Sequence, residues 1–289
     1  MHHVTENYRE ELVNSDLHNK WQRDGFVMVE EVFDQKRTDQ LKSMCESILE
    51  QWRICNPETG EPGGNSDATV MRHLNHSGFF KNDMSELTDL MDAVADDKVL
   101  EICRTILGEE PLFRCTSLFM NPTQTSQDGS WHRDTQFTTK TELEEKAKIQ
   151  SAKETGNAIQ LQIALLASDD VELVPGSHLR WDTTEEYHIR KADDGANSRS
   201  NAISGAQCIA LQPGDALAFN PCGLHRGRYH TDKSRRTLML TYTKTSVPCS
   251  DYFSHQPWFL EEGYLETLTS GTRPFFETFV AAYKSDWKN

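Results

Sequence analysis

Several features that mark whole classes of protein are missing from this sequence. No apolar run among its 289 residues is long enough to span a bilayer, which excludes an ordinary transmembrane helix. The seven cysteines are irregularly spaced and form no C-x-x-C pair, which argues against a disulfide framework or a zinc ribbon. There is no internal repeat and no low-complexity tract. We therefore expect a globular protein with reduced thiols, located in the cytoplasm.

Positive charge is also scarce. Lys and Arg number 30 against 45 Asp and Glu, and the formal net charge is −15. A surface of this sign repels nucleic acid and anionic membranes, so neither is expected as a partner. The first 19 residues lack the apolar core of a signal peptide.

Common catalytic motifs are absent too. The chain has no G-x-S-x-G, no P-loop and no G-x-G-x-x-G after a strand. His73 and His76 form an H-x-x-H that could face one side of a helix, but the Glu of a zinc protease motif is missing. We expect these two histidines at the surface or near a substrate, not on a metal.

The predicted elements change in kind at Pro111. Residues 1–110 read as mainly helical around one strand at Phe26–Val29, with helices beginning at Asp34 and within Met84–Leu107. Residues 111–250 carry short β-type runs between Pro- and Gly-containing turns, and residues 251–289 look helical again. The runs are residues 111–120, 158–167, 171–174, 208–211, 216–219 and 236–243. Together they predict one α+β, mainly β catalytic domain over 1–289, with a sandwich or barrel core.

Two polar stretches interrupt the β-type region. Thr141–Thr155 is charged and helix-prone, and either a solvated helix or a lid that closes over substrate fits it. Asp182–Gly205 reads as a polar loop.

The first chemical signal is His132-Arg133-Asp134. Residues two apart on a strand face the same side, so His132 and Asp134 could reach one cation together. Two histidines and one carboxylate on one face of the metal form the site of non-haem iron(II) oxygenases. Alone, H-x-D has low specificity, since a chance pair on a surface strand looks the same.

A second histidine and an arginine complete the pattern. His225 follows the run at 216–219, and Arg236 begins the run at 236–243. A guanidinium can hold a carboxylate through two hydrogen bonds, which would suit the distal carboxylate of 2-oxoglutarate. Arg235 competes for this role, because consecutive strand residues face opposite sides and only one can point inward.

Five motifs in order give the sequence a family likeness. The chain resembles the phytanoyl-CoA dioxygenase family of iron(II)/2-oxoglutarate-dependent oxygenases. The matching pieces are Asp24-Gly25-Phe26-Val27, Trp131-His132-Arg133-Asp134, Leu173-Val174-Pro175-Gly176-Ser177-His178, Pro213-Gly214-Asp215, and His225 with Arg236 eleven residues later. The segment Ser168–Glu172 is shorter than the family's usual connection, so we expect the local strand register to differ from the family's there.

The resemblance implies a double-stranded β-helix, a cupin-like jelly roll, flanked by N- and C-terminal helices. It implies Fe(II) on His132, Asp134 and His225, with 2-oxoglutarate and O2 as cosubstrates and Arg236 on the distal carboxylate. Asn121 and Gln162 fall where the family places polar cosubstrate contacts, although Gln162 could equally be a polar residue on a half-exposed strand. His178 is expected in a structural, hydrogen-bonding role.

The expected activity is hydroxylation of a small natural-product or specialised metabolite, with release of succinate and CO2. Asp134 favours hydroxylation over halogenation, because related halogenases have a small residue there. Desaturation or cyclisation, acyl-CoA or amino-acid-derivative substrates, a non-catalytic β-helix binding protein and a zinc hydrolase with the same ligands remain as alternatives. The oligomeric state is open.

Overall fold

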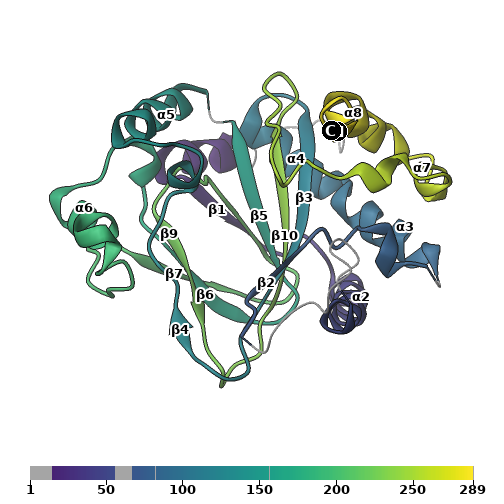
Figure 1. The fold of residues 1–289 in the computed structure, drawn as a ribbon, viewed down its shortest axis with the longest axis horizontal. Coiled ribbons are helices and arrows are strands. Elements are labelled where there is room, and N and C mark those ends of the chain that lie inside the picture. The colour runs from purple at the N-terminus through teal and green to yellow at the C-terminus, as the bar shows by residue number, and fades with distance from the viewer. Residues whose placement is uncertain (1–14, 56–66, 82, 156, 289) are drawn as a thin grey trace, which may run out of the picture.

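Two antiparallel sheets face each other between two groups of helices (Figure 1). The computed structural model describes residues 15–55, 67–81, 83–155 and 157–288. Most of the segment considered for a signal peptide therefore lies outside the described residues. The arrangement confirms the predicted mixed fold with a jelly-roll core and flanking helices.

The larger sheet has the strand order β1-β8-β5-β10-β3-β2, and the smaller has the order β4-β9-β6-β7. The strands are β1 (Phe26–Val29), β2 (Val70–Arg72), β3 (Pro111–Met120), β4 (Gln127–Asp128), β5 (Ala158–Ala164), β6 (Ser168–Leu173), β7 (Gln207–Leu211), β8 (Ala216–Phe219), β9 (His225–Tyr229) and β10 (Arg236–Lys244).

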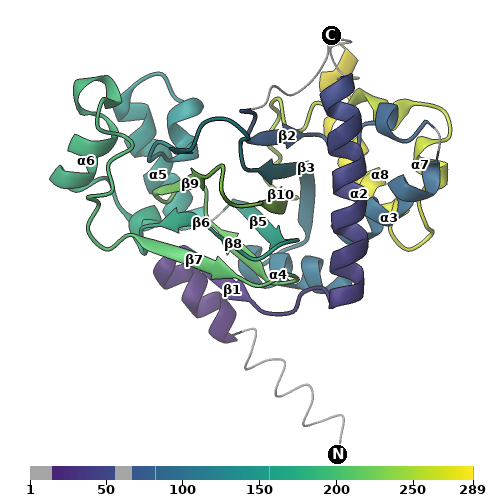
Figure 2. The ribbon, with the colours of Figure 1, turned by 90° about the horizontal axis from the view of Figure 1, so that it is seen from below.

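The helices gather at opposite ends of the molecule. Figures 1 and 2 both show α5 and α6 at one end and α2, α3, α7 and α8 at the other. The α-helices are α2 (Gln35–Ile54), α3 (Met84–Val94), α4 (Asp97–Leu107), α5 (Glu142–Thr155), α6 (Thr184–Arg190), α7 (Tyr264–Thr267) and α8 (Arg273–Tyr283), preceded by a helical stretch at residues 15–24. Short 3-10 turns are η1 (Ser77–Phe79), η2 (Asp134–Phe137), η3 (Ser177–Leu179), η4 (Ala192–Gly195), η5 (Pro257–Leu260) and η6 (Asp286–Lys288).

The two faces of the larger sheet have different partners. On β10, Leu238, Leu240 and Tyr242 pack into the main apolar cluster with residues of α2, α3, α4 and α8. Leu217 and Phe219 of β8 instead meet residues of β6 and β7 in a second cluster between the sheets. The side chains of alternate strand residues therefore point either to the helices or to the interior between the sheets. The main cluster includes residues from Leu17 to Trp287, and the single domain over 1–289 stays a prediction.

Local capping explains several element boundaries. The Asp34 side chain accepts a hydrogen bond from the backbone N–H of Arg37 at 2.7 Å and starts α2. Gly108, at φ 71°, ends α4 in the left-handed region. None of the described helices is long and apolar enough to cross a membrane.

Two expectations need correction. The stretch Asp182–Gly205 is not simply a loop, because it contains α6, whose capping box links Thr183 and Glu186. The H-x-x-H pair does not lie on a helix face: His73 is buried with φ 56°, and His76 caps η1.

Candidate metal centre

The backbone brings His132 and His225 together from distant parts of the chain. The two residues form an isolated antiparallel bridge, each N–H donating to the other's carbonyl oxygen at 3.0 Å. His225 begins β9, which is held in the smaller sheet between β4 and β6. Its position is therefore fixed by strand pairing on both sides.

Asp134 is positioned in another way than predicted. It begins the 3-10 turn η2 and is not on a strand, so the two-residue strand period does not place it. Its backbone N–H donates to Pro221 O at 2.9 Å, which ties it to the segment that leads into His225. Gln160 Nε2 donates to Asp134 Oδ2 at 2.5 Å.

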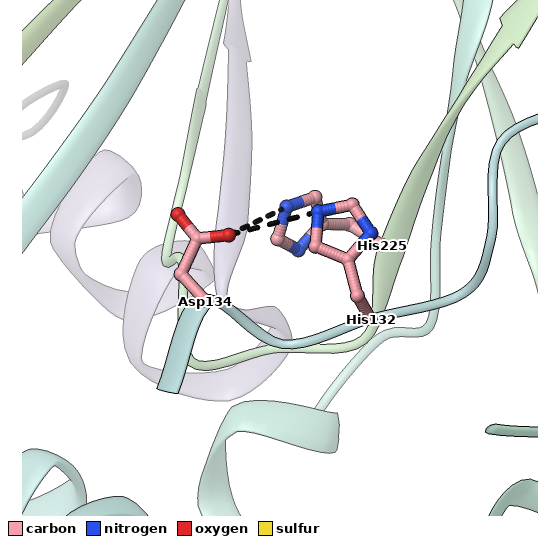
Figure 3. A group of neighbouring side chains, drawn as sticks. All are labelled: His132, Asp134 and His225. Atoms are coloured by element: carbon pink, nitrogen blue, oxygen red, sulfur yellow. Dashed lines mark ion pairs between the residues drawn. The ribbon is translucent and has the colours of Figure 1, made fainter. Parts of the chain in front are cut away.

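The three side chains converge on one point (Figure 3). Asp134 Oδ1 lies 3.6 Å from His132 Nε2 and 3.5 Å from His225 Nε2. One ligand atom from each residue lies within 4.8 Å of the others. Two imidazole nitrogens and one carboxylate oxygen on one side of a point suit a first-row divalent metal with open positions left over.

Hydrogen bonds set both histidines for metal binding. His132 Nδ1 lies 2.8 Å from Ser130 O, and His225 Nδ1 lies 3.0 Å from Gly223 O. A carbonyl oxygen only accepts, so Nδ1 carries a proton in both rings, and Nε2 is the nitrogen turned toward the metal position. Burial, together with the neighbouring His132, lowers the pKa of His225 to about 4, so this ring is neutral near pH 7.

Strand register places Gln162 in the interior between the sheets. Gln162 pairs with Leu217 on one side and Met239 on the other, and Leu217 belongs to the inter-sheet cluster. Asn121 follows β3 directly and is buried, with Nδ2 donating to Lys233 O at 3.1 Å. Both predicted cosubstrate contacts are thus buried polar residues. Sequence reasoning missed Gln160, although its two-residue spacing from Gln162 on β5 was a usable signal.

The two adjacent arginines at the start of β10 point to opposite faces of the sheet. The inward residue is Arg235, whereas the sequence predicted Arg236. Arg236 points to α2, where its Nε lies 3.6 Å from Glu46 Oε1. Arg235 is 1% exposed, donates from Nε to Thr237 Oγ1 at 3.2 Å, and lies over the Phe119 and Tyr229 rings. Thr237 pairs with Ala164 of the inter-sheet cluster, so Arg235 is the inward residue.

The surroundings of the centre are partly open. The Asp134 side chain is 33% exposed, and the Phe137 ring, 69% exposed, lies 5.5 Å from the His132 ring. An apolar surface therefore stands beside the ligands. His178 is buried against Gly25 and does not belong to the triad, and its expected hydrogen-bonding role stays a prediction.

The fold is similar to those of several solved proteins. The chain is similar to EctD from S. alaskensis, solved with bound Fe (TM-score 0.57, 17% identity, 84% of this chain and 81% of that one). It is similar to AviO1 from Streptomyces viridochromogenes (TM-score 0.56, 16% identity, 82% and 98%). It also resembles SnoN, a non-haem α-ketoglutarate-dependent epimerase from nogalamycin biosynthesis (TM-score 0.56, 15% identity, 81% and 84%).

Comparison by sequence finds fewer matches than comparison by structure, but it identifies the family. No curated protein sequence matches this chain. A sequence profile of the family described as phytanoyl-CoA dioxygenase (PhyH) matches residues 21–237, which include His132, Asp134 and His225. The chain therefore belongs to the phytanoyl-CoA dioxygenase family of iron(II)/2-oxoglutarate-dependent oxygenases, as its five ordered motifs predicted.

Proposed function

We propose that this chain is an iron(II)/2-oxoglutarate-dependent oxygenase that hydroxylates a small molecule, with iron on His132, Asp134 and His225. The observation that carries the proposal is the convergence of two Nε2 atoms and one carboxylate oxygen, with both Nδ1 atoms held by carbonyls. A chance cluster of polar side chains would have no reason to fix both tautomers.

The interior also suits the cosubstrate. In the described part of the chain, the buried polar atoms without a hydrogen-bond partner include Arg235 Nη1, Gln162 Oε1 and Asn121 Oδ1. Arg236 Nε is another, but it lies on the side that meets Glu46 of α2. A buried polar atom left unpaired is costly, so such atoms mark the place of a missing partner. We propose that Arg235, and not Arg236, binds the distal carboxylate of 2-oxoglutarate, with Gln162 and Asn121 lining the same space.

Each residue has a defined part in this scheme. When bound, iron with 2-oxoglutarate and O2 supplies the oxidising power to hydroxylate a C–H bond, with release of succinate and CO2. Gln160 orients the Asp134 carboxylate by donating to the oxygen that faces away from the histidines. Arg235 fixes the cosubstrate's far end, and the two histidines present neutral nitrogens to the metal.

The substrate is proposed to be a natural product or specialised metabolite with an apolar part. Phe137 offers an exposed ring beside the ligands, and the net charge of −15 disfavours a polyanionic CoA ester. Related folds have been solved with small molecules: SnoN with nogalamycin RO, and EctD with 5-hydroxyectoine. Acyl-CoA or amino-acid-derivative hydroxylation is the second candidate within the same chemistry.

The competing functions predict different metal behaviour. A zinc hydrolase would use the same three ligands without 2-oxoglutarate, so Arg235 would only make its contacts to Thr237 and the buried Asp170. A binding protein that has lost oxygen chemistry would not need Nε2 atoms prepared for a metal. Metal content after aerobic purification and the binding of 2-oxoglutarate separate these two from the oxygenase.

The test is an anaerobic titration of the metal-free protein with Fe(II) and 2-oxoglutarate, followed by visible absorption. We expect a weak charge-transfer band that needs both additions and disappears in Asp134→Ala and His225→Ala. His255→Ala, at an exposed histidine outside the centre, is the matched control and should keep the band. A folded wild-type protein without the band would contradict the oxygenase proposal.

A further inference from the structure

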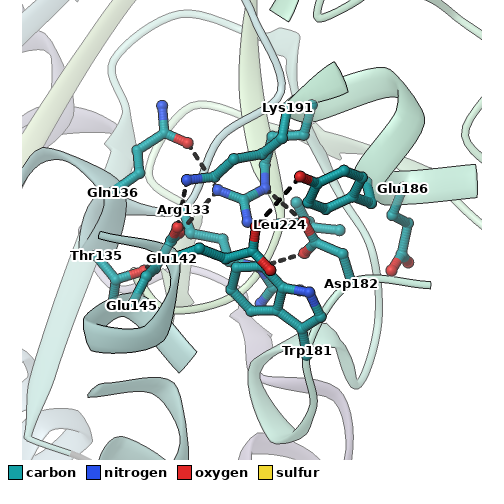
Figure 4. A network of polar contacts seen from close by, with 12 residues as sticks. Arg133, Thr135, Gln136, Glu142, Glu145, Trp181, Asp182, Glu186, Lys191 and Leu224 are labelled. Atoms are coloured by element: carbon teal, nitrogen blue, oxygen red, sulfur yellow. Dashed lines mark hydrogen bonds and ion pairs between the residues drawn. The ribbon is translucent and has the colours of Figure 1, made fainter. Parts of the chain in front are cut away.

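A buried group of charges includes Arg133, the residue between the ligands His132 and Asp134, and the proposed chemistry does not use it (Figure 4). The side chains of Arg133, Asp182, Arg190 and Glu145 are fully excluded from solvent. They come from the residue before η2, the segment before α6, the end of α6 and the first turn of α5. Their formal charges cancel, which is the condition under which such a group can stay buried.

Arg133 joins this group to both ligand-bearing segments. It lies between His132 and Asp134, and its Nη1 donates to Ser177 O at 2.7 Å and to Cys222 O at 2.6 Å. Cys222 precedes His225 by three residues, in the segment that also receives the Asp134 N–H. One guanidinium therefore ties the Asp134 segment to the His225 segment, through a fixed fork that a lysine does not have.

The rest of the group holds the other side of the Asp134 segment. Arg133 Nε donates to Asp182 Oδ1 at 2.9 Å, and Asp182 Oδ2 accepts from Arg190 Nε at 2.8 Å. Arg190 Nη1 donates to Glu145 Oε1 at 2.8 Å and to Gln136 Oε1 at 2.9 Å. Gln136 belongs to η2, so the contacts return to the turn that begins with Asp134.

Buried charges are a poor source of stability, because desolvation offsets most of their attraction. Their better-attested effect is to fix one arrangement of the groups around them. Asp134 needs such support, since it has no strand neighbours, whereas His225 is held by strand pairing. Asp134 has no backbone bridge of the kind that joins His132 and His225, and its turn is the one that the charged group contacts, through Gln136.

Resting on the proposed metal site, we propose that Arg133 is a positioning residue. Its contact with Cys222 O holds the Asp134 turn against the segment that carries His225. Asp182, Arg190 and Glu145 hold the other side of that turn. Together these contacts set the separation of the three ligand atoms. It follows that α5 is a fixed support for the metal centre and not a lid.

The test uses Co(II) alone as the probe, because Co(II) absorption reports ligand geometry without cosubstrate or turnover. Outer contacts of metal ligands typically contribute ~10–100-fold to metal affinity, so Arg133→Lys should weaken Co(II) binding by that range and change its visible spectrum. Glu145→Gln, three ion pairs away from Arg133, should act in the same direction more weakly. The Glu145→Gln variant still tests the proposal if Arg133→Lys fails to fold.

Arg273→Lys is the matched control. Arg273 donates to two backbone carbonyls, of Glu266 and Leu268, at the opposite end of the molecule. It should lower the melting temperature and leave Co(II) affinity unchanged. Wild-type Co(II) affinity and spectrum in folded Arg133→Lys and Glu145→Gln would overturn the proposal, as would an equal loss in Arg273→Lys or no Co(II) binding by the wild type. Failure of the Fe(II) and 2-oxoglutarate band with normal Co(II) behaviour would contradict only the proposed function.

Discussion

Arg235 and Arg236 are neighbours of the same residue type whose guanidinium groups face opposite sides of β10. A hydrogen bond to a charged group contributes about 1.5–3 kcal/mol, and every 1.4 kcal/mol is tenfold in affinity. Arg235→Gln should therefore weaken 2-oxoglutarate binding about ten- to a hundredfold, and Arg236→Gln should change it little. Titration of the Fe(II) protein measures both constants. The reverse order would return the role to Arg236.

His178 gives the fold an acid sensitivity. Burial lowers its pKa to about 4, against 6.5 for an unfolded histidine. The unfolded chain then binds more protons between these values, so stability is present above pH 6.5 and is lost as pH falls toward 4. The loss is at most about 3 kcal/mol from this group. In His178→Gln, the urea midpoint of unfolding should change less between pH 6.5 and pH 4 than it does in the wild type. An unchanged pH dependence would assign the sensitivity to other groups such as His225.

Gly25 faces the same imidazole. Its φ is +80°, and an added Cβ would lie 2.3 Å from His178 Nδ1. Gly25→Ala combines backbone strain with overpacking and should cost about 2–4 kcal/mol in the free energy of unfolding. Gly108→Ala isolates the first contribution, because φ is +71° and no atom lies within 4 Å. It should cost only about 1–2 kcal/mol. Equal losses in urea unfolding would show that His178 moves aside freely.

At the scale of elements, the question is whether α5 is a fixed support for the metal centre or a lid over it. Its Glu145 and Ile149 side chains are buried, and Glu145 meets Arg190 and Lys191. Amide hydrogen exchange in α5 should therefore be the same, within about twofold, before and after Fe(II) and 2-oxoglutarate are added. Exchange in α2, remote from the centre, provides the reference. Strong new protection confined to α5 would indicate closure.

Strands were predicted better than the ligand-bearing turn. The run Pro111–Met120 matches β3 end to end, because its apolar residues are bounded by a helix stop and a turn. The phase at Arg235 and Arg236 depends on where β10 meets β5 and β3, and the turn at Asp134 depends on its contact with Pro221, neither of which a local pattern specifies. The short helix α6 has a polar composition that gave no apolar periodicity, and the partner of its Arg190 in α5, Glu145, is distant in sequence.

For the whole molecule, binding of Fe(II) and 2-oxoglutarate should raise the thermal stability. A ligand at a hundred times its Kd adds about 2.7 kcal/mol, or about 5–10 °C in Tm for a chain of this size. Fe(II) with 2-oxoglutarate under anaerobic conditions should raise the Tm of the metal-free wild type by that amount, and chelation should reverse it. Asp134→Ala should show no such shift; an equal rise there would place the binding elsewhere.

The bridge between His132 and His225 also bears on how the protein is made. It joins segments separated by α5, α6 and four strands, so closing it carries the entropy of a long loop and follows the pairing of the smaller sheet. A nascent chain that ends before β9 has only two of the three ligands. Metal acquisition is therefore expected late in folding, after synthesis has passed residue 225, which keeps a redox-active ion off the unfinished chain.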